Sequence, residues 1–379
     1  MTGKNPAVGT GDVYRQLARL LDTIPNGFPA TRSGVELELL SRLFTPAQAA
    51  LALQMKLIPE PVEQIAARAG GEPDKVKAEL EAMVERGLIR AKERQGKVSY
   101  GLIPFVVGIY EEQLTRLDEE LARLFEEYYQ QAFHELLTVK PAMQRVIPVE
   151  QSVAVGIEVM PYESASALLG EAQSWGVMDC ICRTQKKLLG EPCKHPVSVC
   201  MIFSQHPNVF DGSHGIRPVT KDEALAVLRQ AEAAGLVHTV GNTQRGVYYI
   251  CNCCTCSCAI LRGVAQYGLL SAIAPSAFQA RVDEKLCGGC ELCLERCQFG
   301  ALSMLDGVCK VDQRRCFGCG VCVEACGDSA LTLVSRPPGE VKAPPPSMVE
   351  WMGERAASRG LDAQALEKVM GRLAERKPR

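Results

Sequence analysis

The 379-residue chain lacks a strong charge of either sign, an apolar leader and a long apolar run. Its formal net charge of −2 gives no overall field that would attract nucleic acid or an anionic membrane. The opening segment Met1–Gly11 is polar, which argues against secretion. The most apolar later stretch, Ala259–Pro275, is interrupted by Arg262, Gln266 and Gly268, so we expect no membrane span.

Cysteine is also missing from the first part of the chain, because all 18 cysteines lie at or after Cys180. Disulfide scaffolds are usually short and secreted, whereas this chain is long. Neighbouring thiols such as Cys253 and Cys254 suit metal ligation better than two independent bridges. We therefore predict metal-bound thiolates, which need a reducing compartment, and we expect a cytoplasmic protein.

Two cysteine-rich segments near the C-terminus match at an offset of 29 residues: CGGCELCLERC (287–297) and CFGCGVCVEAC (316–326). Each is a C-x2-C-x2-C-x3-C run, and together they resemble a bacterial ferredoxin domain with two [4Fe–4S] clusters. In such a run three thiolates wrap one cubane and the fourth ligates the other cluster. The first cluster is therefore assigned to Cys287, Cys290, Cys293 and Cys326, and the second to Cys316, Cys319, Cys322 and Cys297.

The repeat departs from the ferredoxin pattern directly after the fourth cysteine of each run. Proline usually stands there, but this chain has Gln298 and Gly327. The ligands themselves are unaffected, so we expect cluster binding with altered hydrogen bonding and potential. Two zinc sites are a poorer interpretation, because four-thiolate zinc sites need only paired C-x2-C units.

A second cysteine field precedes the repeat. It comprises nine thiols: Cys180, Cys182, Cys193, Cys200, Cys251, Cys253, Cys254, Cys256 and Cys258. Adjacent thiols on an extended strand point to opposite faces, so not all nine can converge on one cluster without a turn. We predict one or two further [4Fe–4S] clusters here, with zinc as the alternative.

Three further residues lie near this field or the repeat. Arg183 is a candidate donor to cluster sulfides, or alternatively a surface arginine. His195 is a weaker ligand candidate for which a structural role is preferred. Cys309 stands alone in its segment and is expected to be a buried free thiol.

The cysteine-free region carries alternating helix and turn signals. We predict helices over Asp12–Asp22, Val35–Phe44, Pro46–Lys56, Pro61–Ala69 and Asp74–Arg86, then strands over Leu88–Lys92 and Lys97–Leu102. This order resembles a winged helix-turn-helix over residues 35–105. A DNA-reading helix normally presents lysine and arginine, but 74–86 has a charge balance of −1. Despite four cations in the wing, we expect protein docking rather than DNA binding.

Leucines at three- and four-residue steps predict one long amphipathic helix over Glu111–Val139. We thus expect a multidomain α+β protein with five regions. These are a winged-helix-like domain (10–110), the long helix (111–140), a Cys-rich domain (145–275), a dicluster ferredoxin domain (281–335) and a Pro-rich linker with a helical tail (336–379).

The segments MDCICRTQKKLLGEPCKHPVSVCMIF and AEAAGLVHTVGNTQRGVYYICNCCTCSC resemble a little-characterised group of Cys-rich iron–sulfur proteins from anaerobes. That resemblance implies anaerobic electron transfer but no specific reaction. The chain has no P-loop, dinucleotide-binding turn or catalytic dyad. We therefore predict an electron-transfer subunit rather than an enzyme, which serves a larger oxidoreductase that carries flavin or another catalytic cofactor.

Two alternative functions stay open from the sequence. One is a redox- or oxygen-sensing winged-helix regulator, in which clusters report to a DNA-binding domain. The other is an iron–sulfur enzyme component with an open cluster in 180–258. The acidic predicted recognition helix counts against the first, and an exchangeable cluster ligand would favour the second.

Overall fold

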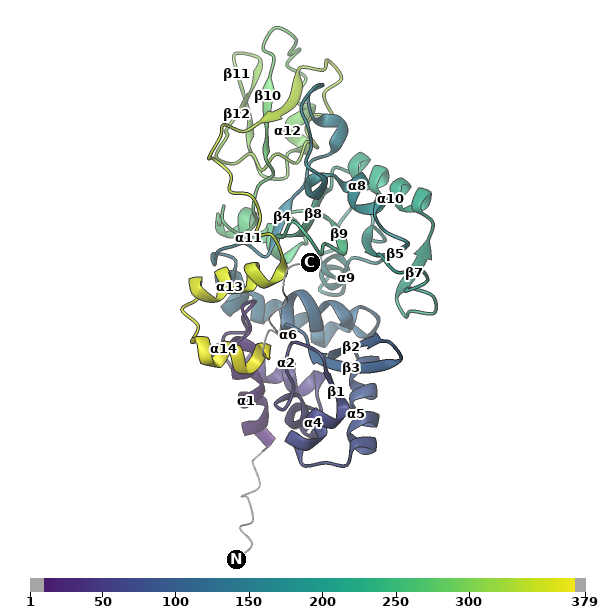
Figure 1. Ribbon diagram of the computed structural model, residues 1–379. Coiled ribbons are helices and arrows are strands. Elements are labelled where there is room, and N and C mark those ends of the chain that lie inside the picture. Colours follow the sequence, from purple (N-terminus) through teal and green to yellow (C-terminus); the bar gives the residue numbers. More distant parts are fainter. Residues whose placement is uncertain (1–9, 372–379) are drawn as a thin grey trace, which may run out of the picture. The chain divides into compact units, whose positions relative to one another are not determined.

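The computed structural model describes residues 10–371 and shows a mixed α+β protein (Figure 1). The chain forms two compact units, one of residues 10–136 with 355–371 and the other of residues 137–354. The Cys-rich segment and the ferredoxin-like repeat therefore belong to one unit. The described part of the predicted tail, 336–371, is divided between the two.

The first unit opens with the predicted succession of helices and a hairpin. Its elements are α1 (Thr10–Asp22), α2 (Val35–Leu43), α3 (Pro46–Ala52), β1 (Glu60–Pro61), α4 (Val62–Ala69), α5 (Pro73–Glu85), β2 (Ile89–Arg94) and β3 (Lys97–Leu102). The three strands form one antiparallel sheet in the order β1-β3-β2. Thr45 begins α3 with a capping box, in which its side chain and Gln48 bond each other's backbone N–H.

The prediction of one continuous helix over 111–139 is wrong. The structure has a 3-10 helix at Glu111–Arg116, α6 at Glu119–Tyr128, a π-type segment at Tyr129–Phe133 and the short α7 at His134–Leu136. Leu117 is extended, and Asp118 caps α6 by accepting a 2.8 Å hydrogen bond from Leu121 N–H. A strong N-cap residue thus competes with the apolar periodicity and starts a new helix.

The C-terminal segment contains α13 (Met348–Ser358) and α14 (Ala363–Met370). The sequence predicts a helical tail up to residue 379, and residues beyond 371 lie outside the described part of the chain. Within the first unit, Arg359 donates a 2.6 Å bond to Asp22 Oδ1 and bonds the carbonyls of Asp22 and Ile24. Leu57 N–H also bonds Val369 C=O at 2.9 Å. The tail therefore packs on its own chain.

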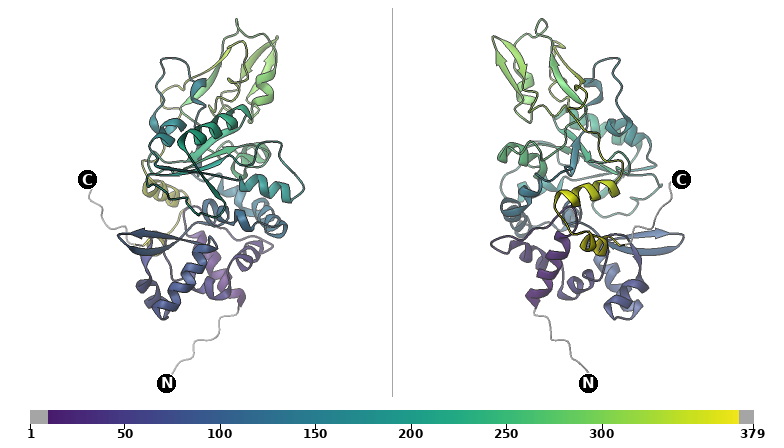
Figure 2. Two further views of the ribbon diagram at one scale, coloured as in Figure 1. Left: turned by 90° about the vertical axis from the view of Figure 1, so that its right-hand side faces the viewer. Right: turned by 60° about the vertical axis from the view of Figure 1, so that its left-hand side comes forward.

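The second unit is built on a six-stranded sheet in the order β4-β8-β9-β6-β5-β7. Its strands are β4 (Gln144–Val146), β5 (Ser174–Met178), β6 (Cys200–Ser204), β7 (Ile216–Val219), β8 (Val237–Gly241) and β9 (Tyr249–Cys253), and every pair is antiparallel. Two helices, α8 (Ala165–Gly170) and α10 (Lys221–Ala233), pack against the sheet (Figure 2). They bury an apolar core with Met201 and Ile250.

The ferredoxin-like repeat follows α11 (Ala259–Tyr267) and forms two antiparallel strand pairs. One pair joins β10 (Phe278–Val282) to β13 (Leu331–Ser335), and the other joins β11 (Leu302–Leu305) to β12 (Val308–Val311). The short α12 (Leu292–Arg296) lies in the first cysteine run. The core of this segment combines Phe278, Leu331 and Leu333 with cysteine side chains. Cysteine side chains therefore form part of the core of this segment.

Candidate metal centres

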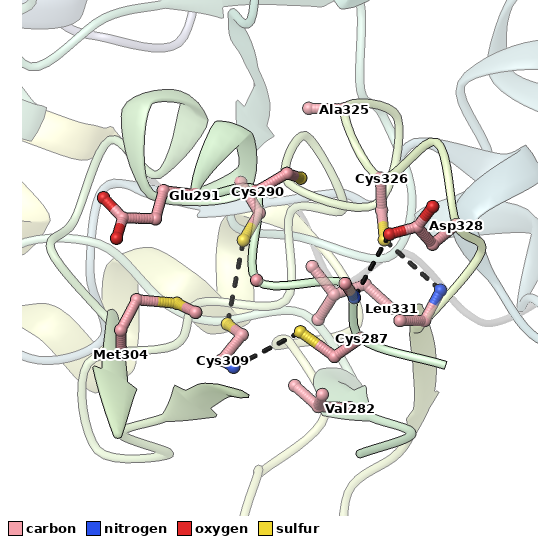
Figure 3. A pocket seen from close by; sticks show the side chains of 14 residues that line it. Val282, Cys287, Cys290, Glu291, Met304, Cys309, Ala325, Cys326, Asp328 and Leu331 are labelled. Atoms are coloured by element: carbon pink, nitrogen blue, oxygen red, sulfur yellow. Dashed lines mark hydrogen bonds between the residues drawn. The ribbon is translucent and has the colours of Figure 1, made fainter. Parts of the chain in front are cut away.

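Two cavities in the repeat are each lined by four predicted ligand cysteines. One holds Cys287, Cys290, Cys293 and Cys326 (Figure 3), and the other holds Cys297, Cys316, Cys319 and Cys322. The two cavities are similar in size. Each cavity draws three cysteines from one run and the fourth from the other, which is the crossed grouping that the spacing predicts.

Backbone N–H groups point at the cysteine sulfurs in the same way in both halves. Ala301 N–H donates to Cys297 Sγ at 3.3 Å, and Ala330 N–H, 29 residues later, donates to Cys326 Sγ at 3.2 Å. A second equivalent pair joins Ala280 to Cys316 and Cys309 to Cys287, both at 3.4 Å. Such N–H donors stabilise negative charge on thiolates and on any cluster they bind.

Equivalent glycines bring each cysteine loop against a neighbouring segment. Gly289 and Gly318 have φ of 71° and 69°. A Cβ at Gly318 would lie 2.1 Å from the Phe278 oxygen, and one at Gly289 would lie 2.6 Å from the Gly307 oxygen. Both the positive φ and the close backbone approach exclude larger side chains, so glycine is needed for the loop conformation.

The two cavities differ at several equivalent lining positions, and one of these differences adds a thiol to the first cavity. Cys309 (Figure 3) occupies the place that Ala280 has in the other half, and its thiol lies 3.7 Å from Cys293 Sγ. Cys309 is buried, and burial raises the pKa of its thiol to about 12. The prediction of a buried thiol is confirmed, and the first cavity thus contains a fifth cysteine beside its four candidate ligands.

The nine thiols of the second cysteine field divide into two groups. Six of them adjoin one another in a closed ring, in which each thiol influences the pKa of the next, in the order Cys180, Cys182, Cys258, Cys253, Cys251 and Cys200, which returns to Cys180. We refer to these residues as the six-thiol ring. Cys193, Cys254 and Cys256 are left, and they gather around His195.

Strand alternation separates these groups. Ile250 in β9 and Met201 in β6 belong to the apolar core beneath α8 and α10. Their neighbours Cys251 and Cys200 therefore face the other side of the sheet. Cys254, by contrast, is buried in that apolar core, and Cys193 packs against it. This division agrees with the prediction that adjacent thiols such as Cys253 and Cys254 point to opposite faces of a strand.

Two helices begin at the six-thiol ring. Cys180 directly precedes α9 (Ile181–Leu188), and Cys258 directly precedes α11. Helix N-termini carry partial positive charge and stabilise thiolates. Hydrogen bonds from other thiols of the ring hold the pKa of Cys180 well below its ordinary value, and the backbone N–H of Arg183 adds to this effect. The same kind of bonding lowers the pKa of Cys253 to about 6.

Arg183 lies between the two groups. It is only 2% exposed, and it donates hydrogen bonds to the carbonyls of Pro196 at 2.9 Å and Asn252 at 2.6 Å. Burial opposes its charge, but thiolates that include Cys180 and Cys254 keep the pKa of Arg183 above its ordinary value. The alternative of a surface arginine is therefore wrong.

The second group is compact. Its three sulfurs are separated by 3.7 Å (Cys193–Cys254), 3.2 Å (Cys193–Cys256) and 3.2 Å (Cys254–Cys256). His195 Nδ1 lies 3.0 Å from Cys193 Sγ and 3.9 Å from Cys256 Sγ. A hydrogen bond from the Cys256 thiol lowers the pKa of Cys254 to about 2. The sequence favours a structural role for His195, and in the structure its ring faces three thiols. The C-x-H and C-x-C spacings are the sequence signal for this group.

A hydrogen-bonded link connects this group to the ferredoxin-like repeat. Gln298, which follows Cys297, accepts bonds from Thr255 N–H at 3.1 Å and from Thr255 Oγ1–H at 3.0 Å. Its amide group donates to Gly235 C=O at 2.9 Å. The residue that replaces the usual proline thus holds the turn between Cys254 and Cys256.

Comparisons of the chain with protein-family models, curated proteins and solved structures found no match. Within residues 10–371, no helix has both the length and the hydrophobicity that a bilayer crossing requires. The function must therefore be inferred from the residues themselves, and the cysteine groups carry most of the information.

Proposed function

We propose that this chain is an iron–sulfur protein that relays single electrons to or from a larger oxidoreductase. One observation carries the proposal: two cavities of similar size are each lined by four cysteines, three from one run and one from the other. Crossed ligation of this kind is characteristic of two-cluster ferredoxins. Two [4Fe–4S] clusters held by one small segment would lie close together, as a relay requires.

The six-thiol ring supplies the ligands for a third [4Fe–4S] cluster. All 18 cysteines are free thiols, so the ring is not closed by disulfides. Two helix N-termini and the buried cation of Arg183 would offset the negative charge of a thiolate-bound cluster. Gln298, which follows the second-cavity residue Cys297, bonds Thr255 and so connects the repeat with the Cys-rich segment.

A relay fits these residues better than catalysis on an open cluster. A cubane has four irons, and the ring offers six thiols, so each iron can be held by a thiolate. Full thiolate ligation leaves no iron free for substrate. We therefore assign the chemical step to a partner that carries flavin or another catalytic cofactor. Free thiolates of this number also suit a reducing compartment such as the cytoplasm.

We interpret the winged-helix-like part of the first unit as a docking module. Two of the three cations on and beside α5 are paired with acids, Lys75 with Glu72 at 2.8 Å and Lys77 with Glu81 at 3.8 Å. The third, Arg86, donates to Gln48 Oε1 at 2.7 Å and to a backbone carbonyl. These bonds occupy the cationic groups on and beside α5 and leave few donors there for phosphates, which weakens the regulator alternative.

The proposal is tested by counting iron and acid-labile sulfide in full-length protein purified without oxygen. We expect about twelve irons and about twelve sulfides per chain, as three cubanes require. Reduction should produce electron paramagnetic resonance signals broadened by magnetic coupling between the two clusters of the repeat. Eight irons would exclude the third cluster, and fewer than eight, with no coupled signal, would contradict the relay. A salt-dependent mobility shift of DNA would instead support the regulator.

A further inference from the structure

We propose that Cys193, His195, Cys254 and Cys256 bind one Zn²⁺ ion in a tetrahedral site, separate from every iron–sulfur cluster. The ligand atoms of these four residues all lie within 4.8 Å of one another. Among the residues that the structure describes, this is the only set of three or more Cys, His, Asp or Glu side chains with that property. The site goes beyond the proposed electron relay and does not depend on it.

The distances fit a single metal ion. Zinc binds thiolate sulfur at about 2.3 Å and histidine nitrogen at about 2.0–2.1 Å, so a tetrahedron has S···S edges of about 3.8 Å and S···N edges of about 3.6 Å. The observed S···S separations are 3.2–3.7 Å, and His195 Nδ1 lies 3.0 and 3.9 Å from two of the sulfurs. Only small movements are needed to reach the coordinated geometry.

A cubane fits the same residues poorly. Its four thiolates bind four different irons, so their sulfurs lie much farther apart than thiolates that share one ion. The sulfurs of Cys193, Cys254 and Cys256 are already in mutual contact. The donor set of three thiolates and one imidazole is a common structural zinc set, and four protein ligands close the coordination sphere. We therefore infer a structural ion rather than a catalytic one.

The position of the site explains what the ion would do. Cys193 and His195 lie in the loop after α9, whereas Cys254 and Cys256 lie in the turn after β9. No hydrogen-bonded strand pair joins that loop to that turn. One ion would join the two segments. It would also restrain Cys253, which is the chain neighbour of Cys254 and whose thiol belongs to the six-thiol ring on the other side of the sheet. The zinc site would thus fix the position of one thiol, that of Cys253, in the neighbouring cluster site.

Zinc content and zinc K-edge X-ray absorption of the full chain test the inference, because both measurements are specific for zinc in the presence of iron. We expect one zinc per chain, with a first shell of three sulfurs at about 2.3 Å and one nitrogen at about 2.0 Å. His195→Cys should keep the zinc and convert the shell to four sulfurs. Cys256→Ser should lower zinc content at least several-fold, whereas Cys309→Ser, a control outside the site, should not change it.

Several results would overturn the site. One is the absence of zinc from the wild-type protein. Another is a zinc shell of oxygen and nitrogen, which surface-bound ions would give, and a third is an unchanged zinc shell in His195→Cys. A single additional iron atom per chain, bound in place of zinc, would also overturn it. Iron and sulfide are counted on the same samples. Normal iron without zinc would reject the zinc site alone, and zinc without iron would reject the electron relay alone.

Discussion

Cys253 and Cys254 are consecutive in the chain, yet their thiols belong to different groups on opposite sides of a sheet. Cys253 adjoins Cys251 and Cys258 in the six-thiol ring, whereas Cys254 lies 3.2 Å from Cys256 and 3.7 Å from Cys193. The alternation of side chains at the end of β9 directs the two sulfurs apart. One short segment can therefore supply ligands to two metal centres, so that a shift of the backbone at one centre would also move a ligand of the other.

The two kinds of cysteine in the first repeat cavity should respond differently to substitution. Cys293→Ala removes a candidate ligand and should reduce the iron content by up to four atoms per chain. Cys309→Ala removes the fifth thiol, which lies 3.7 Å from Cys293, and should leave iron unchanged. Alanine already stands at the equivalent position of the other half, Ala280, so the substitution is conservative. Iron and sulfide analysis checks both variants.

Equal iron loss in both variants would show that Cys309 is a ligand. If neither variant lost iron, the assignment of the cavity to a cluster would fail.

The buried arginine between the thiol groups should set the potential of a cluster in the six-thiol ring. Arg183→Gln removes a positive charge from a site surrounded by thiolates and should favour the oxidised cluster. We expect a reduction potential more negative by roughly 60 mV or more, a factor of ten in a one-electron equilibrium. A redox titration followed by electron paramagnetic resonance measures it.

Arg183→Lys is the matched control for that experiment, because it keeps the charge and loses the planar fork that bonds Pro196 and Asn252. Its potential should stay closer to that of the wild type. A similar shift in both variants would point to lost hydrogen bonds rather than lost charge.

Much of the candidate site was accessible from local sequence. The 29-residue offset groups the ferredoxin-like cysteines, since all eight lie in two short runs whose spacing is dictated by one cofactor geometry. The full grouping of the other nine thiols was not accessible, although strand alternation predicts that Cys253 and Cys254 face opposite sides of the sheet. It depends on pairing between β6 and β9 and on the loop that carries His195, which are contacts between segments about fifty residues apart.

The fold shows the same contrast between local and distant effects. The helices and hairpin of the first unit follow from apolar spacing and turn residues, and their bounds lie close to those predicted. The break at Asp118 was missed because leucine spacing continues through it. The six-stranded sheet could not be predicted either, since its order β4-β8-β9-β6-β5-β7 places strands far apart in sequence side by side.

The link between Gln298 and Thr255 should protect the Thr255 amide from exchange with solvent. Gln298→Ala removes the acceptor that lies 3.1 Å from Thr255 N. If one such bond contributes about 1 kcal/mol, exchange by local opening should become roughly fivefold faster. Hydrogen–deuterium exchange with mass spectrometry of peptides that cover 254–258 reports the change.

Gln313→Ala serves as the control, because Gln313 also donates a side-chain bond within the repeat, to Ala280 C=O, but has no bond to Thr255. Thr255 should exchange at the wild-type rate in that variant. An unchanged rate in Gln298→Ala would mean that other contacts hold the turn.

A carboxyl group in the first unit should make stability depend on pH. Burial raises the pKa of Glu111 to about 7 from an ordinary value of 4.5, although the Gly108 N–H donates to it at 2.6 Å. Between these two values the folded state binds more protons at this site than the unfolded state. Its contribution to the free energy of unfolding therefore falls as pH rises from about 4.5 to about 7.

Glu111→Gln keeps an oxygen that can accept the Gly108 bond and removes the charge. We expect it to be more stable than wild type by about 1–3 kcal/mol at pH 8 and nearly equal to it at pH 4.5. Guanidinium unfolding followed by far-ultraviolet circular dichroism at several pH values measures the difference. Glu38→Gln, which removes an exposed carboxylate on α2, controls for the loss of one negative charge. The same pH profile in both variants, or a gain for Glu111→Gln only below pH 5, would contradict the assignment.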